Sequence, residues 1–338
     1  MSYDRTALGA LLQEHFHGRV KRDEPLAAHS SAGVGGPADF FLELQSNAEV
    51  ERLVSLCAQS RIPLLVIGNG SNILFTDQGV RGMVARMGAM AYRLEEQQRG
   101  VALAVIDAGM TWSDLVKEMA QHGWGGLEFG VGIPGTLGGA IVTNAGAHNE
   151  EIGQHVQWVD VLDARGSTLE EEEAVSIPQL RRYTQADLQL GNRKSRFREQ
   201  RRALITASGQ LVPAPRAMIA PPEIILRLAI NVYRDDEQHM AQRRADYKAS
   251  HQLQIDAFAG HVGPLFKDPF GVKASQLIEQ AGMKALRRGK MQVSAHHANF
   301  LLNQGGAQAT DIASMIVEIH QQVLAQLGVD LEVDIELL

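Results

Sequence analysis

The sequence predicts an α+β protein of two or three domains. A chain of 338 residues is long for a single hydrophobic core. Short apolar runs typical of strands occur beside segments whose apolar residues recur at helical spacing. Two glycine-rich tracts, residues 68–72 and 130–147, lie among these elements. Two such tracts in one chain indicate a long phosphate-bearing ligand that the backbone holds at two places.

Strands are predicted from apolar runs along most of the chain. They lie at 38–44, 64–67, 83–87, 101–106, 158–162 and 224–233. Strict alternation over 329–337 predicts a final strand. The polar face of this strand carries Asp330, Glu332, Asp334 and Glu336.

Helices are predicted from capping residues and from apolar spacing. A short helix within 1–20 leads into a loop at Pro25, and Ser46 begins a capping box before the next helix. Gly123 and Gly328 end two others. The two helices that end at these glycines are expected at 112–122 and 310–327, and two more are expected at 235–252 and 274–280. Residues 208–222 contain four prolines and are predicted to form a long loop.

The composition excludes several classes of function. There are 32 Lys and Arg residues against 39 Asp and Glu, a net charge of −7, which gives no general affinity for nucleic acid or membranes. Cys57 is the only cysteine, so we expect no internal disulfide and a reducing compartment. No apolar run reaches the roughly 18 residues of a membrane span, and no signal peptide precedes the first helix. We expect a cytoplasmic protein, a monomer or weak oligomer without a metal, that binds small molecules.

The tract 130–147 contains six glycines and no acidic or basic side chain. Glycine loses the most backbone entropy on folding, so six in one ordered segment require a reason. One reason is a phosphate or cofactor approached by bare N–H groups, and the other is tight packing of backbone on backbone. The shorter tract lacks the third glycine of a dinucleotide fingerprint and the lysine of a P-loop. We favour a phosphate contact for the longer tract.

Several motifs resemble one enzyme family. They are HSSAGVGGPADFFLEL at 29–44, LLVIGNGSNILFTDQGVRGMV at 64–84, LEFGVGIPGTLGGAIVTNAGA at 127–147, SQLIEQAGMKALRRGKMQVSAHHANFLLN at 275–303 and GVDLEVDIEL at 328–337. Together they are similar to UDP-N-acetylenolpyruvoylglucosamine reductase, also called UDP-N-acetylmuramate dehydrogenase. The resemblance spans almost the whole chain in the right order.

The resemblance implies a PCMH/VAO-type FAD-binding module of two subdomains, at 1–80 and 81–234, and a C-terminal α+β domain for a UDP-sugar, at 235–338. In this family NADPH reduces the FAD, and hydride then passes to UDP-N-acetylglucosamine enolpyruvate during peptidoglycan precursor synthesis. The residues expected to hold FAD are Gly68, Asn69, Gly70, Ser71, Asn72, Gly132, Ile133, Pro134, Gly135, Thr136, Gly138, Gly139, Asn144 and Gly146.

In the family an arginine and a glutamate assist the enolate, and a serine donates the proton. The resemblance places Arg193 at the arginine and Asp334, one methylene shorter, at the glutamate. The alternatives are a solvated basic face for Arg193 and a solvated strand face for Asp334. Pro264 stands at the serine position and has no proton to give. The resemblance implies substrate contacts from Lys267, Asp268, His297 and Asn299.

The sequence leaves the source of the proton open. Water is one candidate, and the others are His148, His261, His296 and His297. It also leaves open a diverged flavoprotein oxidoreductase with another substrate, and a non-catalytic binder of flavin or UDP-sugar. The loop predicted at 208–222 either covers the site or is a surface insertion.

Overall fold

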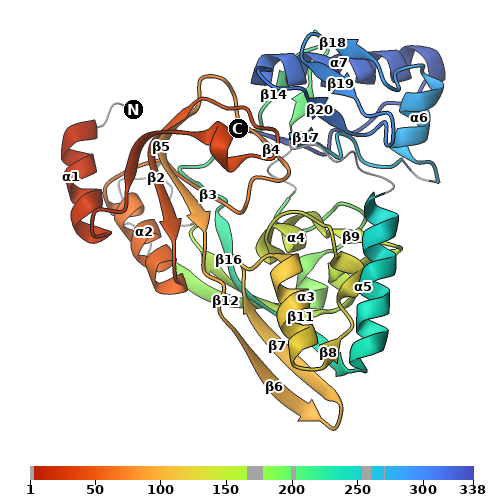
Figure 1. Ribbon diagram of the computed structural model, residues 1–338. Coiled ribbons are helices and arrows are strands. Elements are labelled where there is room, and N and C mark those ends of the chain that lie inside the picture. Colours follow the sequence, from red (N-terminus) through yellow and green to blue (C-terminus); the bar gives the residue numbers. More distant parts are fainter. Residues whose placement is uncertain (1–3, 166–177, 199–202, 253–259, 270) are drawn as a thin grey trace.

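A computed structural model describes residues 4–165, 178–198, 203–252, 260–269 and 271–338. The chain forms three bodies, which Figure 1 colours mainly red to orange, light orange to teal, and blue. Their main sheets have five, six and four strands. Helices pack beside each sheet, as the predicted α+β class requires.

The first body is a mainly parallel sheet. Its elements are α1 (Arg5–His15), β1 (Lys21–Pro25), β2 (Pro37–Leu44), α2 (Asn47–Gln59), β3 (Leu64–Ile67), β5 (Val80–Met87) and β15 (Ile219–Ala220). The strand order is β1-β2-β5-β3-β15, and only β1 is antiparallel to its neighbour. Phe40 and Leu42 of β2 join the core that contains α1 and α2, whereas Phe41 joins a separate cluster. This alternation places helices on one face of the sheet.

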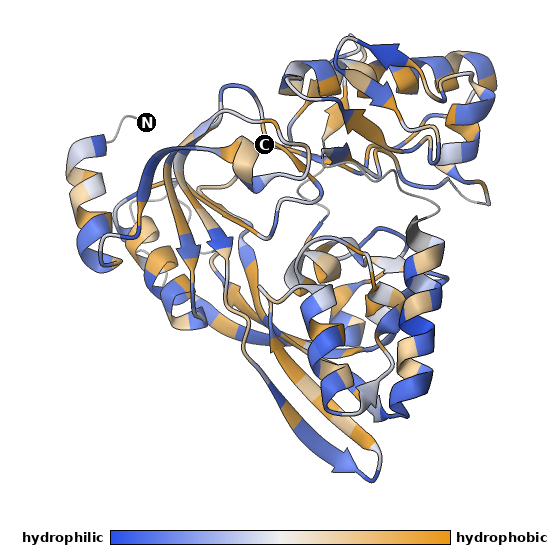
Figure 2. Cartoon of the chain, in the orientation of Figure 1, coloured by the Kyte–Doolittle hydropathy of each residue, from blue (hydrophilic) through white to orange (hydrophobic). Residues whose placement is uncertain are grey.

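The second body is an antiparallel sheet. Its elements are β6 (Tyr92–Gln98), β7 (Val101–Asp107), α3 (Trp112–Gln121), β8 (Trp124–Gly125), α4 (Leu137–Thr143), β11 (Val156–Asp163), β12 (Gln179–Thr184), β16 (Glu223–Arg234) and α5 (Glu237–Gln252). The strand order is β12-β11-β16-β7-β6, and β8 pairs with the end of β16. Figure 2 shows the hydrophilic edge strand β6 beside the hydrophobic β7.

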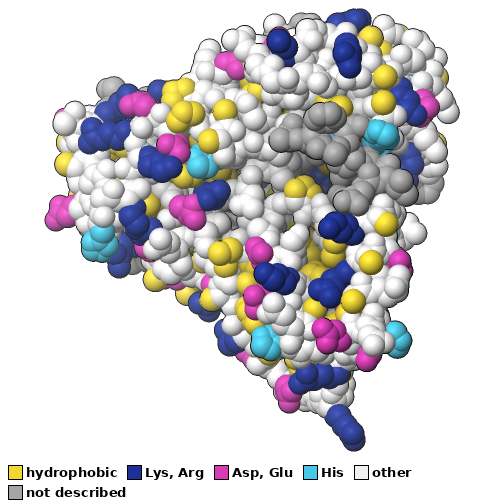
Figure 3. Space-filling model, viewed as in Figure 1, with side chains coloured by type: hydrophobic (Ala, Val, Ile, Leu, Met, Phe, Trp, Pro, Cys, Tyr) yellow, Lys and Arg dark blue, Asp and Glu magenta, His cyan; other side chains and the backbone are white. Residues whose placement is uncertain are grey.

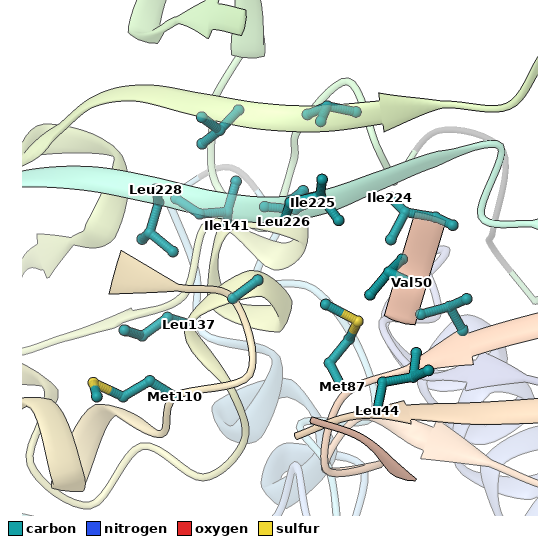
Figure 4. Packing of buried hydrophobic residues seen from close by; sticks show 14 of the residues in the cluster. Leu44, Val50, Met87, Met110, Leu137, Ile141, Ile224, Ile225, Leu226 and Leu228 are labelled. Carbon is teal, nitrogen blue, oxygen red and sulfur yellow. The ribbon is translucent and has the colours of Figure 1, made fainter. Parts of the chain in front are cut away.

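The first two bodies share one hydrophobic core. Leu44 and Met87 of the first sheet lie in the same cluster as Ile224 and Leu228 of β16, as Figure 4 shows. The boundary predicted between residues 80 and 81 falls inside β5, whose whole length pairs within the first sheet. The chain also returns to this sheet at β15. The first body is therefore assembled from two separate stretches of sequence.

The third body carries α6 (Ala274–Gln280) and α7 (Ala309–Leu327) beside a small sheet. Its strands are β17 (His261–Val262), β18 (Arg287–Arg288), β19 (Met291–Val293) and β20 (Leu301–Asn303). They pair antiparallel in the order β17-β20-β19-β18. The predicted apolar stripe of α7, which includes Ile312, Ile316 and Ile319, is buried. Gly328 ends the helix with φ of +69°, in agreement with the sequence prediction.

Residues 208–222 are not one long loop, which corrects the sequence prediction. β13 (Leu204–Ile205) and β14 (Leu211–Val212) form a hairpin, and its Ile205 and Leu211 side chains pack on the third body. The chain then reaches β15, which pairs in parallel with β3. These strands have two residues each, so they are too short to produce a recognisable period.

The final strand is also shorter than predicted. Val333 forms a single bridge with Phe266, and β21 (Glu336–Leu337) then pairs in parallel with β4 (Ile73–Leu74). The apolar face holds, because Leu331 and Leu337 are both buried, whereas Asp334 of the predicted polar face is buried as well. The segment crosses from the third body to the first, as the position of the C label beside β4 in Figure 1 shows. It therefore changes partner along its length and cannot form one continuous strand.

Several elements have no counterpart in the sequence prediction. β1, β6 and β12 are strands with mostly polar side chains, so they lack an apolar alternation. α4 contains two adjacent glycines, which have low helix propensity. Two short strands, β9 (Gly146–Ala147) and β10 (Glu150–Glu151), follow α4.

The surface carries both signs of charge. On the face in Figure 3, Lys and Arg side chains are interspersed with Asp and Glu. Within the described residues, no helix has both the length and the apolar character that crossing a bilayer demands.

Candidate functional site

A cavity of about 1550 Å³ opens where the three bodies meet. Its wall includes Asn69 from the first body, Gly139 and Arg193 from the second, and Pro264 and His297 from the third. Pockets for drug-sized ligands usually have about 300–1,000 Å³. The cavity therefore has room for a larger ligand, or for two ligands side by side.

The loop 68–72 exposes backbone N–H groups to this cavity. Gly70 has φ of +65°, and a Cβ there would overlap the carbonyl oxygen of His29, so only glycine fits. Among the described residues, the amides of Asn69, Gly70 and Ser71 donate to no protein acceptor. Successive open amides beside a left-handed residue form a concavity typical of phosphate binding.

The start of α4 is arranged differently. Thr136 caps the helix, since its Oγ1 accepts a hydrogen bond from the Gly139 amide at 3.3 Å. The Leu137 and Gly138 amides donate to carbonyl oxygens of residues 110 and 108, at 2.8 and 2.9 Å. These amides are satisfied inside the protein. The two glycine tracts therefore do not offer equivalent anion sites.

Most glycines of the second tract are required by neighbouring protein atoms. A Cβ would lie within 3 Å of another residue at Gly130, Gly135, Gly138 and Gly146. Tight packing against protein atoms therefore explains these four, but the nearest atom belongs to the backbone only at Gly146 and to a side chain at the other three. Gly139 is different, because its nearest neighbour is Thr136 Oγ1 at 3.5 Å and it lines the cavity. Space for a ligand remains beside Gly139.

Asn144 braces α4 against the turn that carries Arg193. It adopts φ of +46° at the C-cap. Its Nδ2 donates to Gly191 O at 2.9 Å and to Glu151 Oε2 at 2.6 Å, and its Oδ1 accepts from the Gly153 amide at 3.1 Å. Asn144 lines the cavity, as predicted for a cofactor residue, but its amide group is occupied by the protein.

Arg193 sits at the tip of a tight turn. Gly191 and Lys194 exchange two backbone hydrogen bonds, of 3.1 and 3.0 Å. Arg193 has φ of +50°, a conformation that costs a side-chain-bearing residue about 1–2 kcal/mol. Ser195 Oγ holds the turn by donating to Val142 O at 2.6 Å. The Arg193 side chain is only 21% exposed, which excludes a solvated basic face.

Asp334 is buried between two arginines. Arg193 Nε donates to Asp334 Oδ2 at 2.8 Å, and Arg198 Nη2 lies 2.9 Å from Oδ1. The exposed fraction of Asp334 is 0%, which excludes a solvated strand face. Both arginines line the cavity, whereas Asp334 lies behind them. One carboxylate between two guanidinium groups leaves a net positive charge at this part of the wall.

Backbone contacts fix Asp334 in this place. Its amide donates to Leu265 O at 2.7 Å. Its carbonyl oxygen accepts from Asn72 Nδ2 at 2.9 Å, and the Glu336 amide donates to Asn72 O at 3.0 Å. One segment thus joins all three bodies at the cavity wall.

Only part of the segment 263–268 reaches the cavity. Pro264 and Asp268 line it. The Asp268 carboxylate accepts from Lys273 Nζ and from the Ala274 amide, both at 2.9 Å, and so holds the start of α6. Lys267 lies outside the described wall, with its Nζ 3.0 Å from Glu332 Oε1. The structure therefore does not bring Lys267 together with the other predicted substrate residues.

Asn299 and His297 lie on one loop of the third body. Asn299 clamps Phe266, because its Oδ1 accepts from the Phe266 amide at 3.0 Å and its Nδ2 donates to the Phe266 carbonyl at 2.7 Å. The His297 amide donates to Ser294 Oγ at 3.0 Å. Burial lowers the pKa of the His297 imidazole. Both residues line the cavity.

The other candidate histidines divide between wall and surface. His148 and His261 line the cavity. His148 stacks on Tyr247 of α5, with ring centroids 4.5 Å apart. His296 is exposed and lies outside the described wall.

The structure gathers most predicted cofactor residues on one wall. These are Gly68, Asn69, Gly70, Ser71, Asn72, Gly132, Ile133, Pro134, Thr136, Gly138, Gly139, Asn144 and Gly146, whereas Gly135 lies behind it, against Ser71. Sequence reasoning missed Ser31, Arg198 and Glu336, which also line the cavity. Ser31 lies in the motif at 29–44, so the motif could have identified it as a site residue. Arg198 is one of several adjacent arginines, so nothing in the sequence distinguished it.

Comparisons with known proteins agree with this arrangement. Residues 38–171 match the family model of the FAD binding domain, and residues 254–338 match that of the UDP-N-acetylenolpyruvoylglucosamine reductase C-terminal domain. The UDP-N-acetylenolpyruvoylglucosamine reductase of Heliobacterium modesticaldum is 33% identical over 325 residues, 96% of this chain and 92% of the relative. That of Moorella thermoacetica is 33% identical over 335 residues, 98% of each chain.

A solved structure gives the same result for the fold. The crystal structure of the reductase from Thermus caldophilus has a TM-score of 0.69 to this chain at 28% identity, covering 94% of this chain and 98% of the other. The predicted fold class, an FAD-binding module followed by a C-terminal α+β domain, is confirmed.

Proposed function

The chain belongs to the UDP-N-acetylenolpyruvoylglucosamine reductase family of FAD-dependent oxidoreductases, and we propose that it converts UDP-N-acetylglucosamine enolpyruvate to UDP-N-acetylmuramate, a peptidoglycan precursor, with NADPH as reductant. The observation that carries this proposal is the cluster of Arg193, Asp334 and Arg198, which lies at the same cavity as the open amides of the loop 68–72. A positive charge and a phosphate cradle suit a cofactor and a substrate that are both anionic.

The residues present fit FAD. The open amides of Asn69, Gly70 and Ser71 would hold pyrophosphate oxygens, and Gly139 leaves room for a close approach to α4. Bound FAD, once reduced by NADPH, supplies the hydride for the double bond.

Reduction of an enol ether beside a carboxylate also requires stabilisation of the developing enolate charge. Arg193 and Arg198 supply this positive charge from the wall. Asp334 does not touch the cavity, so it acts as a positioning residue that holds both guanidinium groups. The donors are fixed before the substrate arrives, which reduces the reorganisation needed during the reaction.

Two half-reactions test the proposal. FAD-loaded protein should lose its flavin absorbance with NADPH and recover it when the enolpyruvyl UDP-sugar is added. Arg193→Ala should leave the reduction by NADPH intact and slow the recovery by about 10²–10³-fold, the usual effect of removing one charge-stabilising donor. Lys194→Ala is the matched control, since Lys194 is exposed on the same turn and lies outside the described wall.

Failure of the wild-type flavin to recover with the UDP-sugar would refute the proposal. Pro264 lines the cavity where the family has its proton donor, so the test is designed to distinguish two further functions. Recovery with other acceptors, but not with the UDP-sugar, would indicate a diverged oxidoreductase. No reduction and no recovery, with UDP-sugar still bound, would indicate a non-catalytic binder.

A further inference from the structure

The proposed reaction adds one hydride and one proton to a carbon–carbon double bond, and the chain lacks the family's proton donor. Pro264 lines the cavity at the serine position and carries neither a hydroxyl group nor a backbone N–H. We propose that His297 donates this proton in its place. This inference rests on the proposed function.

Backbone and ring contacts pack the loop that carries His297 against the residues on either side of Pro264. The carbonyl of Asn299 accepts from the amide that follows Pro264, at 3.0 Å. A Cβ at Gly263 would lie 2.8 Å from the ring of Phe300, and that ring stands edge-on to the His297 imidazole, with centroids 5.0 Å apart. The residues before and after Pro264 are therefore both packed against the loop that carries His297.

Burial and two nearby charges act on the protonation of the imidazole. Its Nδ1 is buried and has no hydrogen-bond partner among the described residues. Two charged side chains of opposite sign face it, Asp268 and Lys273. Burial and Lys273 lower the pKa of His297, and Asp268 raises it. An anionic substrate in the cavity would add a further negative charge and favour the imidazolium form.

The step balances with the groups present. The imidazolium N–H bond of His297 breaks while the electron pair of the enolate forms a C–H bond at the α-carbon. The imidazole is left neutral and takes its next proton from water. The proton-transfer rate should therefore fall as pH rises above the pKa of His297 in the complex.

The two other histidines of the wall are less well placed. His148 belongs to the second body and its ring contacts Tyr247, whereas Pro264 and His297 both belong to the third body. His261 is on β17 and interacts with another group, although its Nε2 has no hydrogen-bond partner among the described residues. They provide comparison variants for the test.

Rapid mixing separates flavin reduction by NADPH from reoxidation by the UDP-sugar. We expect His297→Asn to leave the reduction within twofold of wild type and to slow reoxidation by about 10²–10⁴-fold, the usual contribution of a general acid. The exposed neighbour variant His296→Asn should leave both rates unchanged. Adding Pro264→Ser to His297→Asn should restore reoxidation at least tenfold, because a hydroxyl donor returns to the family position.

A spectroscopic measurement does not depend on turnover. Binding of UDP-N-acetylmuramate, whose carboxylate enters the same cavity, should raise the pKa of one histidine in the NMR titration of the holoenzyme, and His297→Gln should remove that signal. Flavin content and thermal unfolding of each variant exclude misfolding as the cause. Normal reoxidation by His297→Asn, or a loss confined to His148→Asn or His261→Asn, overturns the inference while the proposed function stands. Absence of wild-type reoxidation overturns both.

Discussion

Replacement of Asp334 by asparagine should destabilise the protein strongly, although the two side chains have almost the same shape. The substitution removes the only negative charge between Arg193 and Arg198 in this buried cluster of described residues. The new amide can accept from one arginine, but its NH₂ group must then face the other. Two like charges remain close together behind the cavity wall.

The magnitude follows from the geometry. Arg193 Nε and Arg198 Nη2 lie 2.8 and 2.9 Å from the Asp334 carboxylate oxygens, and the exposed fraction of Asp334 is 0%. Opposite unit charges about 4 Å apart attract by about 4 kcal/mol at an effective dielectric constant of 20. Removing one partner of a buried ion pair typically costs about 3–5 kcal/mol. We therefore expect the free energy of unfolding to fall by about 3–5 kcal/mol.

Urea unfolding of the apoprotein, followed by tryptophan fluorescence, measures this loss. Asp330→Asn is the matched control, because the Asp330 side chain is 82% exposed on the same segment and the asparagine oxygen can still accept from His320 Nε2, which lies 2.8 Å from Asp330 Oδ1. It should change the stability by less than about 1 kcal/mol. Asp334→Glu keeps the charge but adds a methylene to a filled site, for an expected loss of about 1–3 kcal/mol. A loss below about 1 kcal/mol for Asp334→Asn would refute the role given to this ion pair.

Three further predictions concern packing and burial. Gly146→Ala should lower the free energy of unfolding in urea by at least about 1–3 kcal/mol, because its Cβ would overlap the Glu150 carbonyl oxygen. Gly139→Ala should unfold like wild type, and equal effects of the two substitutions would contradict the different roles given to these glycines. Asn299→Ala should cost about 1–3 kcal/mol by leaving a buried backbone amide and carbonyl unpaired, and a neutral result would refute the clamp. Burial raises the pKa of the Cys57 thiol, so the folded protein at pH 8 should not react with a thiol reagent until urea unfolds it, and rapid labelling of the folded protein would contradict its burial.

The elements that sequence could predict are those that are buried on at least one face. β2, β3 and α7 have strong apolar patterns because each packs on a core, and their predicted positions are confirmed. Edge strands such as β6 and β12 bury little, so no period marks them. Their pairing is decided by neighbours distant in sequence.

The site could be predicted only to the level of which segments meet. The motifs predicted functional roles for Arg193 and for the loop 68–72, and both line the same cavity. The burial of Asp334 depends on arginines more than 130 residues away in sequence. The alternating pattern alone was equally consistent with a solvated strand face and with a place in the functional site. Asn144 and Asn299 bind mainly to backbone groups, which leave no trace in a sequence pattern. Some motif residues therefore face the cavity and others hold its wall in place, and only the three-dimensional structure distinguishes the two groups.

The crossing of residues 333–338 from the third body to the first has a consequence for biosynthesis. This segment binds Leu265, Asn72 and Leu74, all of which leave the ribosome before it does. The bodies can begin to fold during translation, but the wall behind Arg193 lacks its carboxylate until Asp334 has emerged. A nascent chain arrested before residue 333 should therefore contain folded sheets and yet lack a finished cavity. Completion of the site therefore has to wait for residues 333–338, and cofactor capture in its final geometry can only follow their emergence.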